Sequence, residues 1–359
     1  MSFTTAQSVE EVSFGLDIQI TGTTGADLFD FRNLARIQLA NTIQLLDGND
    51  RYYGSSGDGN NVDGGAGDDW LYGGNGSDTL IGGSGNDSMV GGEGSDVYEI
   101  NSSGDVIVET GRYGIDTLIV TARTWTLAAP FEGLKAEGTG GLIGIGNNKG
   151  NYLTGGAGDD SRSGLAGRDY MTGAGQDTLL GGTGSDIYYV TDHSVTIVEL
   201  AKEGIDTIVT EAASWTLTGA VENLSLIGDA DAVGIGSASG NVMVANGTGN
   251  ETLQGTGGND TLVGYRGGAR LEGGTGNDSY SVGVLGGQIV ELAHEGVDRV
   301  DVYFGIGVDP ITFPAISAYI LPDFIEQLYL HPQLEMGSND QDRPVIRNRE
   351  CQQQSDRRR

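Results

Sequence analysis

The sequence predicts an all-β fold, a parallel β-roll (β-helix) solenoid of nonapeptide blocks joined by β-rich connectors. Three observations predict it. Of the 359 residues, 63 are glycine, far above the usual share of about 7%. The glycines recur with a nine-residue period that places Asp at position 6 and a large apolar residue at position 8. The blocks that carry this period recur in turn at intervals of 90 and 92 residues.

The first block, residues 46–100, contains the most regular repeats. After an imperfect lead-in, it reads GGAGDDWLY, GGNGSDTLI, GGSGNDSMV and GGEGSDVYE from Gly64 without a gap. Glycine at positions 1, 2 and 4 lets the chain turn tightly with a positive φ. The last three residues of each unit alternate in direction and predict a short strand. The position-8 side chains should therefore stack as a narrow apolar core, formed in this block by Leu71, Leu80, Met89 and Tyr98.

Two later blocks repeat the unit with departures. The second block, residues 146–190, lacks one residue in its fourth unit, and the third block, residues 236–282, is more degenerate. Arg162 takes an inward position that is apolar in the other units, and Ala269 stands where an aspartate is expected. Three further aspartate positions carry other polar residues, namely Asn151, Asn241 and Glu251.

The connectors show a second, longer repeat. They comprise residues 101–145, 191–235 and 283–336, and contain the related segments VETGRYGIDTLIV, VELAKEGIDTIVT and VELAHEGVDRVDV. Their alternating apolar and polar residues predict half-buried strands rather than helices. Residues 1–45 are expected to form an N-terminal β-rich partial unit, because VEEVSFG resembles the connector segment VENLSLIG. We therefore expect each connector to continue the solenoid and to share its core with the neighbouring blocks.

The charge balance and the motifs exclude several classes of protein. With 50 acidic and 19 basic residues, the net charge is −31, so a nucleic acid partner is not expected. A single cysteine cannot build a disulfide scaffold, and no apolar run reaches the length of a membrane span. We expect no enzyme, because signatures of nucleophilic or phosphate chemistry are absent. The segment from His294 to Asp298 lacks the second histidine of a zinc-protease motif and occupies a repeat position.

The repeated aspartates require a cation between the turns. Two nonapeptides make one coil, so Asp69 should lie above Asp87 and Asp78 above Asp96, about 4.8 Å apart. Two carboxylates at that distance repel by about 1–3 kcal/mol. Calcium fits best, since carboxylates and turn carbonyls offer only oxygen, and magnesium is the alternative with a stricter geometry. Zinc and copper would require His or Cys in the turns. A solvated acidic surface is the other interpretation of the aspartates.

These nonapeptides resemble the RTX, or haemolysin-type, calcium-binding repeats of secreted bacterial proteins. The resemblance implies a parallel β-roll, several bound Ca²⁺ ions, export by type I secretion machinery, and folding on calcium outside the cell. It also implies that the third block binds fewer ions or binds them more weakly. Carried over to the matching positions, the ligand role falls on ten aspartates: Asp69, Asp78, Asp87, Asp96, Asp160, Asp169, Asp177, Asp186, Asp260 and Asp278.

We therefore expect a secreted, extracellular calcium-binding array without catalytic activity. One alternative is the calcium and export module of a secreted protease, lipase or polysaccharide-modifying enzyme. Another is an adhesin or surface-layer component with a cell-surface or polysaccharide partner. The N-terminus lacks the features of a cleaved signal peptide. The irregular basic tail, residues 337–359, is interpreted as a frameshift or truncation, with a basic disordered tail as the alternative.

Overall fold

The structure is a computed structural model that describes residues 12–13, 20–33, 37–38, 42–57, 59–200, 202–265, 268–283, 287–292, 295–303 and 324–331. It divides into two compact units, Met1–Thr172 with Asp177–Gly181, and Gly173–Gln176 with Gly182–Arg359. Together the units hold about 14 turns of parallel β-solenoid, and the described residues include no helix. The predicted fold class is therefore confirmed. The tail at 337–359 and residues 304–323 of the last connector lie outside the described residues.

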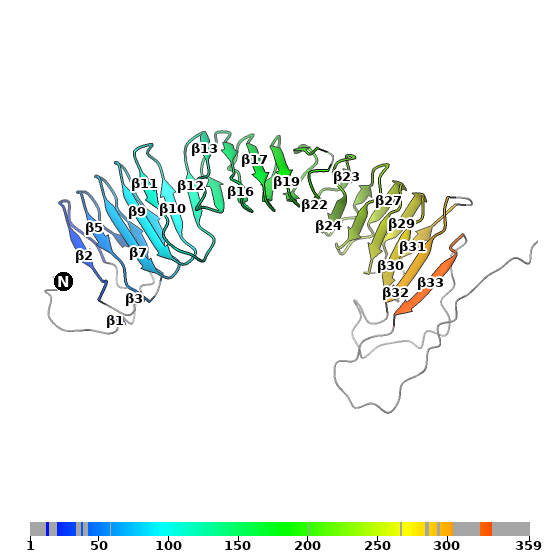
Figure 1. Cartoon of the computed structure of the whole chain (residues 1–359), viewed down its shortest axis with the longest axis horizontal. Coiled ribbons are helices and arrows are strands. Elements are labelled where there is room, and N and C mark those ends of the chain that lie inside the picture. The colour runs from blue at the N-terminus through cyan, green and yellow to red at the C-terminus, as the bar shows by residue number, and fades with distance from the viewer. Residues whose placement is uncertain are drawn as a thin grey trace, which may run out of the picture. The chain divides into compact units, whose positions relative to one another are not determined.

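The first unit winds its strands alternately into a long sheet and into two separate shorter sheets on the facing side (Figure 1). The long sheet contains β4 (Ile43–Gln44), β6 (Asn61–Asp63), β8 (Thr79–Ile81), β10 (Val97–Ile100), β12 (Thr117–Val120), β14 (Gly133–Ala136), β16 (Tyr152–Thr154) and β18 (Tyr170–Gly173). The facing strands are β2 (Leu28–Asp30), β5 (Arg51–Tyr53), β7 (Trp70–Asn75), β9 (Ser88–Glu93) and β11 (Val106–Val108), then β13 (Thr124–Thr126), β15 (Ile143–Ile145), β17 (Ser161–Ala166) and β19 (Thr178–Thr183). Separately, β1 (Val12–Ser13) pairs with β3 (Ile37–Gln38).

The second unit has the same plan. Its long sheet contains β20 (Ile187–Val190), β22 (Thr207–Thr210), β24 (Asn223–Leu226), β26 (Val242–Ala245), β28 (Thr261–Gly264), β30 (Ser279–Gly283), β32 (Arg299–Tyr303) and β33 (Gln327–His331). Its other strands are β21 (Thr196–Val198), β23 (Ser214–Thr216), β25 (Val233–Ile235), β27 (Thr252–Gly257), β29 (Arg270–Thr275) and β31 (Gln288–Val290). No helix long and apolar enough to cross a membrane occurs in the described part of the chain.

The strand register confirms that two nonapeptides make one coil. Leu71 on β7 pairs with Met89 on β9, and Leu80 on β8 pairs with Tyr98 on β10, each 18 residues further along the chain. All four side chains are 0% exposed, so position 8 forms the predicted core. The connectors continue the solenoid as predicted: β12 pairs with β10 and with β14, and β22 pairs with β20 and with β24.

The glycines of the unit have two different roles. Gly83 and Gly85, at positions 2 and 4 of one unit, have φ of +89° and +144°, as the sequence predicted. Gly82 at position 1 is not in the left-handed region, so the prediction of a positive φ is wrong there. A Cβ at Gly82 would lie 2.5 Å from Asp87 Oδ2 and 3.0 Å from Asp87 Cβ. Position 1 is glycine because the aspartate of the same unit fills that space.

Candidate metal centres

The position-6 aspartates stack into ladders along the turns of the solenoid, which we call the aspartate ladders. In the first block, the backbone N–H of Asp69 donates to Asp87 Oδ1 at 2.9 Å, and that of Asp78 donates to Asp96 Oδ1 at 2.8 Å. The predicted stacking of these two pairs is confirmed. Asp50 extends one ladder, since its N–H donates to Asp69 Oδ1 at 2.8 Å. One oxygen of each carboxylate is thus fixed by the backbone of the preceding coil.

The second carboxylate oxygen points into the turn of its own unit. In Asp69, Asp78, Asp87 and Asp96, Oδ2 is buried and accepts no hydrogen bond. A Cβ on Gly64 would collide with Asp69 Oδ2 and lie 2.6 Å from the carbonyl oxygen of Gly82, one coil further along. A carboxylate oxygen and a backbone carbonyl therefore face the same small space. Oxygens of these two kinds, converging at about 2.3–2.6 Å, are the ligands that Ca²⁺ takes.

Burial disfavours the ionised form of the ladder carboxylates. It raises the pKa of Asp69 and Asp96 from 3.8 to about 6, and that of Asp78 to about 7. Loss of solvation is the largest cause in all three, and the hydrogen bonds from the preceding coil offset part of it. The charge of the next aspartate along each ladder raises the pKa of Asp69 and Asp78 further. At neutral pH, a folded ladder is therefore electrostatically costly unless a cation compensates its charge.

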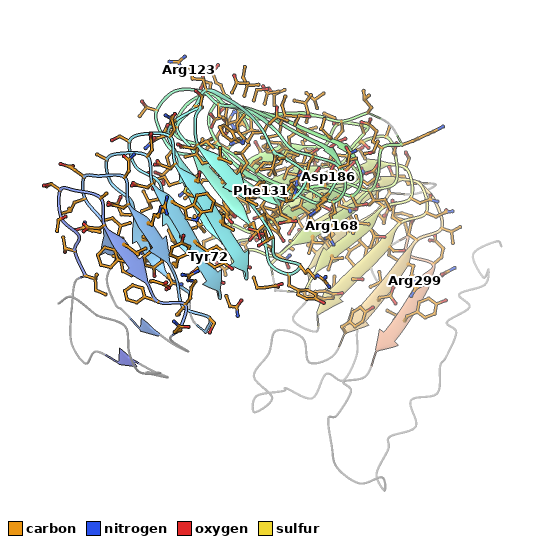
Figure 2. The ribbon with its side chains drawn as sticks, turned by 60° about the vertical axis from the view of Figure 1, so that its left-hand side comes forward. Tyr72, Arg123, Phe131, Arg168, Asp186 and Arg299 are labelled. Atoms are coloured by element: carbon orange, nitrogen blue, oxygen red, sulfur yellow. The ribbon has the colours of Figure 1, made fainter. Side chains whose placement is uncertain are left out.

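All ten predicted aspartates are buried, with at most 3% exposure. Asp186, labelled in Figure 2, is 0% exposed and its N–H donates to Asp206 Oδ1 at 2.8 Å. In the second block, Asp160 N–H donates to Asp177 Oδ1 at 2.8 Å, and Asp169 Oδ1 accepts the N–H of Asn151 at 2.7 Å. In the third, Asp260 N–H donates to Asp278 Oδ1 at 2.7 Å. Each of the ten thus takes part in a ladder hydrogen bond. Their role as calcium ligands stays a prediction.

The residues that replace aspartate affect the ladders differently. Asn241 keeps the ladder hydrogen bond, because its N–H donates to Asp260 Oδ1 at 2.7 Å. Its side-chain Oδ1 accepts the N–H of Ser237 at 2.7 Å, and it adds no charge. Ala269 is 0% exposed and supplies no oxygen from its side chain. These replacements give the third block fewer carboxylates than the first.

Three acidic triads lie at the ends of the blocks, and the nonapeptide repeat did not predict them. In each triad, one carboxylate oxygen per residue lies within 4.8 Å of the others, and the triads are Asp96–Glu109–Asp116, Asp186–Glu199–Asp206 and Asp278–Glu291–Asp298. Their signal is the recurrence of VE and ID or VD in the connector segments. The nine-residue phase concealed it, because the connector coil from Asp96 to Asp116 takes 20 residues instead of 18. We call these three groups the closing triads.

Comparison with known protein families matches the repeats themselves. The family described as the RTX calcium-binding nonapeptide repeat (4 copies) matches residues 40–60, 63–98, 145–174, 154–188 and 246–280. The matches fall within or beside the three predicted blocks, and in the third block they begin at residue 246 rather than 236. No curated protein and no solved structure matches the chain significantly.

Proposed function

We propose that this chain, which carries RTX haemolysin-type calcium-binding nonapeptide repeats across much of its length, is an extracellular, non-enzymatic array that folds as it binds several Ca²⁺ ions. The observation that carries the proposal is the row of buried Oδ2 atoms without a hydrogen-bond donor at Asp69, Asp78, Asp87 and Asp96. A buried carboxylate oxygen without a donor is unfavourable unless a cation balances it. The alternative of a merely solvated acidic surface does not fit their burial.

The chain's own residues prepare each position for the ion. The backbone N–H of the preceding coil holds Oδ1, and this directs Oδ2 toward the position-1 glycine. Glycine at that position leaves room for Oδ2, and at Gly64 a carbonyl oxygen of the next coil faces the same space. Bound Ca²⁺ would supply the positive charge that successive carboxylates of a ladder need. Magnesium should bind less well, because it prefers a strict octahedron and retains its water.

Linkage between binding and folding makes calcium a switch. An ion that binds only the folded chain stabilises it by about 1.4 kcal/mol when its concentration is ten times the dissociation constant. Extracellular calcium modules have dissociation constants of about 10⁻⁴–10⁻³ M. In a cytosol poor in calcium the ladders would stay unfolded, which suits export by a type I system, and several sites together would fold them outside. RTX repeats of this kind are typical of type I-secreted bacterial proteins.

Calorimetric titration of the full chain tests the proposal. We expect uptake of several Ca²⁺ ions per chain at concentrations near those of the extracellular medium, with heat released as the chain folds. Magnesium at the same concentrations should give much less uptake. Absence of calcium uptake, or equal uptake of both ions, would overturn the assignment. Co-expression with a type I exporter tests the export step, which fails if the chain stays inside the cell.

A further inference from the structure

We propose that each closing triad is a second kind of Ca²⁺ site, which lies at the C-terminal end of its block and binds Ca²⁺ more tightly than the aspartate ladders do. This inference rests on the proposed function, because it needs calcium to be the ion of the array. The first member of each triad is the position-6 aspartate of the last unit in its block, and the other two members belong to the connector. Each triad thus joins one predicted ladder aspartate, Asp96, Asp186 or Asp278, to two connector carboxylates that the nonapeptide repeat does not predict.

The first triad arises because a glutamate replaces a position-1 glycine. Val108 on β11 pairs with Val90 on β9, so Glu109 stands one coil beyond Gly91. Glu109 Oε2 accepts the hydroxyl of Tyr98 at 2.6 Å, and its Oε1 accepts the N–H of Gly111 at 2.6 Å. These two hydrogen bonds fix the carboxylate beside Asp96, whose own N–H donates to Asp116 Oδ1 at 2.9 Å.

Each of the three clusters contains a buried carboxylate oxygen without a hydrogen-bond donor, which in the second triad is Glu199 Oε2. Asp96 is 0% exposed and its Oδ2 accepts no hydrogen bond. In the third triad, Asp278 Oδ2 and Glu291 Oε2 are also buried and without a donor. A Cβ on Gly273 would lie 2.7 Å from Glu291 Oε1 and would collide with Asp278 Oδ2 and the Tyr280 hydroxyl. Two carboxylates and a phenol thus converge on one point, which is a hard-cation environment.

The charge of the triads sets them apart from the ladders. Each triad gathers three carboxylates, whereas one step of a ladder joins two. A divalent cation relieves more repulsion here than in a ladder, because more negative charge surrounds it.

The same four residues, two aspartates, a glutamate and a tyrosine, recur at the end of all three blocks. Tyr188 donates its hydroxyl to Glu199, and Tyr280 donates to Glu291, as Tyr98 does to Glu109. Each tyrosine is the position-8 residue of the last unit in its block and is 0% exposed. The tyrosine ring lies in the core while its hydroxyl reaches the triad. Each block therefore ends in the same arrangement of a tyrosine and three carboxylates.

The triple variant Glu109→Gln, Glu199→Gln and Glu291→Gln tests the closing sites. Glutamine keeps an acceptor for each tyrosine hydroxyl and removes only the charge. In calorimetry of the full chain, we expect the tightest class of Ca²⁺ sites to weaken at least tenfold while the weaker class is unchanged. The exposed triple variant Glu93→Gln, Glu137→Gln and Glu211→Gln is the matched control and should bind as the parent does.

Terbium provides a second readout that does not depend on the triple variant folding. Tb³⁺ bound at a triad should be excited through the adjacent tyrosine, so Tyr98→Phe, Tyr188→Phe and Tyr280→Phe together should abolish most of the tight-site emission. Tyr72→Phe should not change it. A tight class that survives the glutamine variant, or emission that survives the phenylalanine variant, overturns the closing sites while the calcium array stands. A parent chain that binds no calcium overturns both proposals.

A different observation supports a second inference: we infer that the Arg162 guanidinium takes the place of the ion at one step of a ladder. Arg162 occupies position 8, where other units have Leu, Met or Tyr, and its side chain is 1% exposed. Its Nη2 donates to Asp177 Oδ2 at 2.6 Å, and its Nη1 lies 3.5 Å from Asp160 Oδ2. A Cβ on Gly155 would collide with both Nη1 and Asp160 Oδ2. The cation therefore lies in the space that the Oδ2 atom of a ladder aspartate faces.

This internal cation makes the step between Asp160 and Asp177 independent of calcium. The guanidinium bridges the Oδ2 atoms of two successive ladder aspartates, while Asp160 N–H still donates to Asp177 Oδ1 at 2.8 Å. A buried arginine is tolerated where carboxylates pair with it, and removing the charge leaves the two carboxylates uncompensated. We therefore expect this step to hold together in calcium-free solution while other ladder steps open.

The variant Arg162→Met tests this inference, because methionine is the position-8 residue at Met89 and Met171. We expect the variant to bind one more Ca²⁺ ion than the parent and to need a higher calcium concentration to fold. Arg123→Met, at an exposed position, is the control and should leave both quantities unchanged. Unchanged ion uptake in Arg162→Met, or an equal change in both variants, overturns the inference. Native mass spectrometry in calcium counts the ions directly.

Discussion

Replacement of Asp87 by asparagine separates the role of its charge from that of its hydrogen bond. Asp87 is 0% exposed, and its Oδ1 accepts the N–H of Asp69 at 2.9 Å. Its own N–H donates to Asp105 Oδ1 at 3.0 Å, so it takes part in two steps of one ladder. In Asp87→Asn the side-chain oxygen can still accept from Asp69, while the charged Oδ2 becomes an amide.

The variant should affect the calcium-free and calcium-bound states in opposite directions. Without calcium, removing one charge relieves repulsion of about 1–3 kcal/mol, so the residual structure should persist or increase. With calcium, two ladder steps lose a charged ligand. If both steps become empty at ten times their dissociation constant, the folded state loses about 3 kcal/mol. The calcium concentration at the folding midpoint should then rise several-fold.

Circular dichroism during calcium titration measures the midpoint. Asp229→Asn is the matched control, because Asp229 is exposed, lies outside the ladders and accepts a hydrogen bond from the Thr248 hydroxyl. Its midpoint should equal that of the parent. If the two substitutions shift the midpoint equally, Asp87 is not a calcium ligand, because its carboxylate then acts only as a solvated surface charge.

Four further predictions follow from the same geometry. Gly82→Ala should destabilise the calcium-bound chain by about 1–3 kcal/mol in thermal unfolding, since its Cβ would lie 2.5 Å from Asp87 Oδ2, whereas Gly219→Ala, with nothing within 4 Å, should not. Leu80→Ala should lower the free energy of unfolding in urea by about 2–5 kcal/mol, because Leu80 is 0% exposed in a single-file core; a loss below 1 kcal/mol would contradict that core. Ala269→Asp should raise calcium uptake by the third block, measured by calorimetry, and unchanged uptake would count against the ladder there. Folding raises the pKa values of Asp69, Asp78 and Asp96 from 3.8 to about 6, 7 and 6, so ionising each one costs the calcium-free fold on the order of 1–2 kcal/mol after discounting for solvent screening. Circular dichroism in chelator should therefore show more β structure at about pH 5 than at about pH 8. More β structure at the higher pH would contradict this prediction.

Residue periodicity predicted the parts of the fold that repeat exactly. The nine-residue phase placed Leu71, Leu80, Met89 and Tyr98 in one core, and the structure buries all four completely. It also predicted the stacking of Asp69 on Asp87, because two short strands and two turns close one coil. These features depend on local spacing alone, which a single sequence records in full.

Features that depend on packing between coils could not be predicted in the same way. The closing triads were not predicted because Glu109 stands where the repeat has a position-1 glycine, and because the longer connector coil shifts Asp116 out of the nine-residue phase. The reason for glycine at position 82 was not predicted, because it is the space that Asp87 occupies and not the φ of Gly82 itself. Arg162 was placed correctly as an inward residue, yet its pairing with Asp177 depends on a contact with the next coil.

The claim that calcium folds the ladders is best tested by circular dichroism and amide hydrogen exchange, each measured with and without calcium. We expect circular dichroism near that of a random coil in chelator and a β-rich spectrum in millimolar calcium, with magnesium far less effective. We also expect that the amide of Asp69, which donates to Asp87 Oδ1, exchanges its hydrogen quickly in chelator and slowly in calcium. A β-rich chain in chelator with that amide already protected would contradict the claim that calcium folds the ladders.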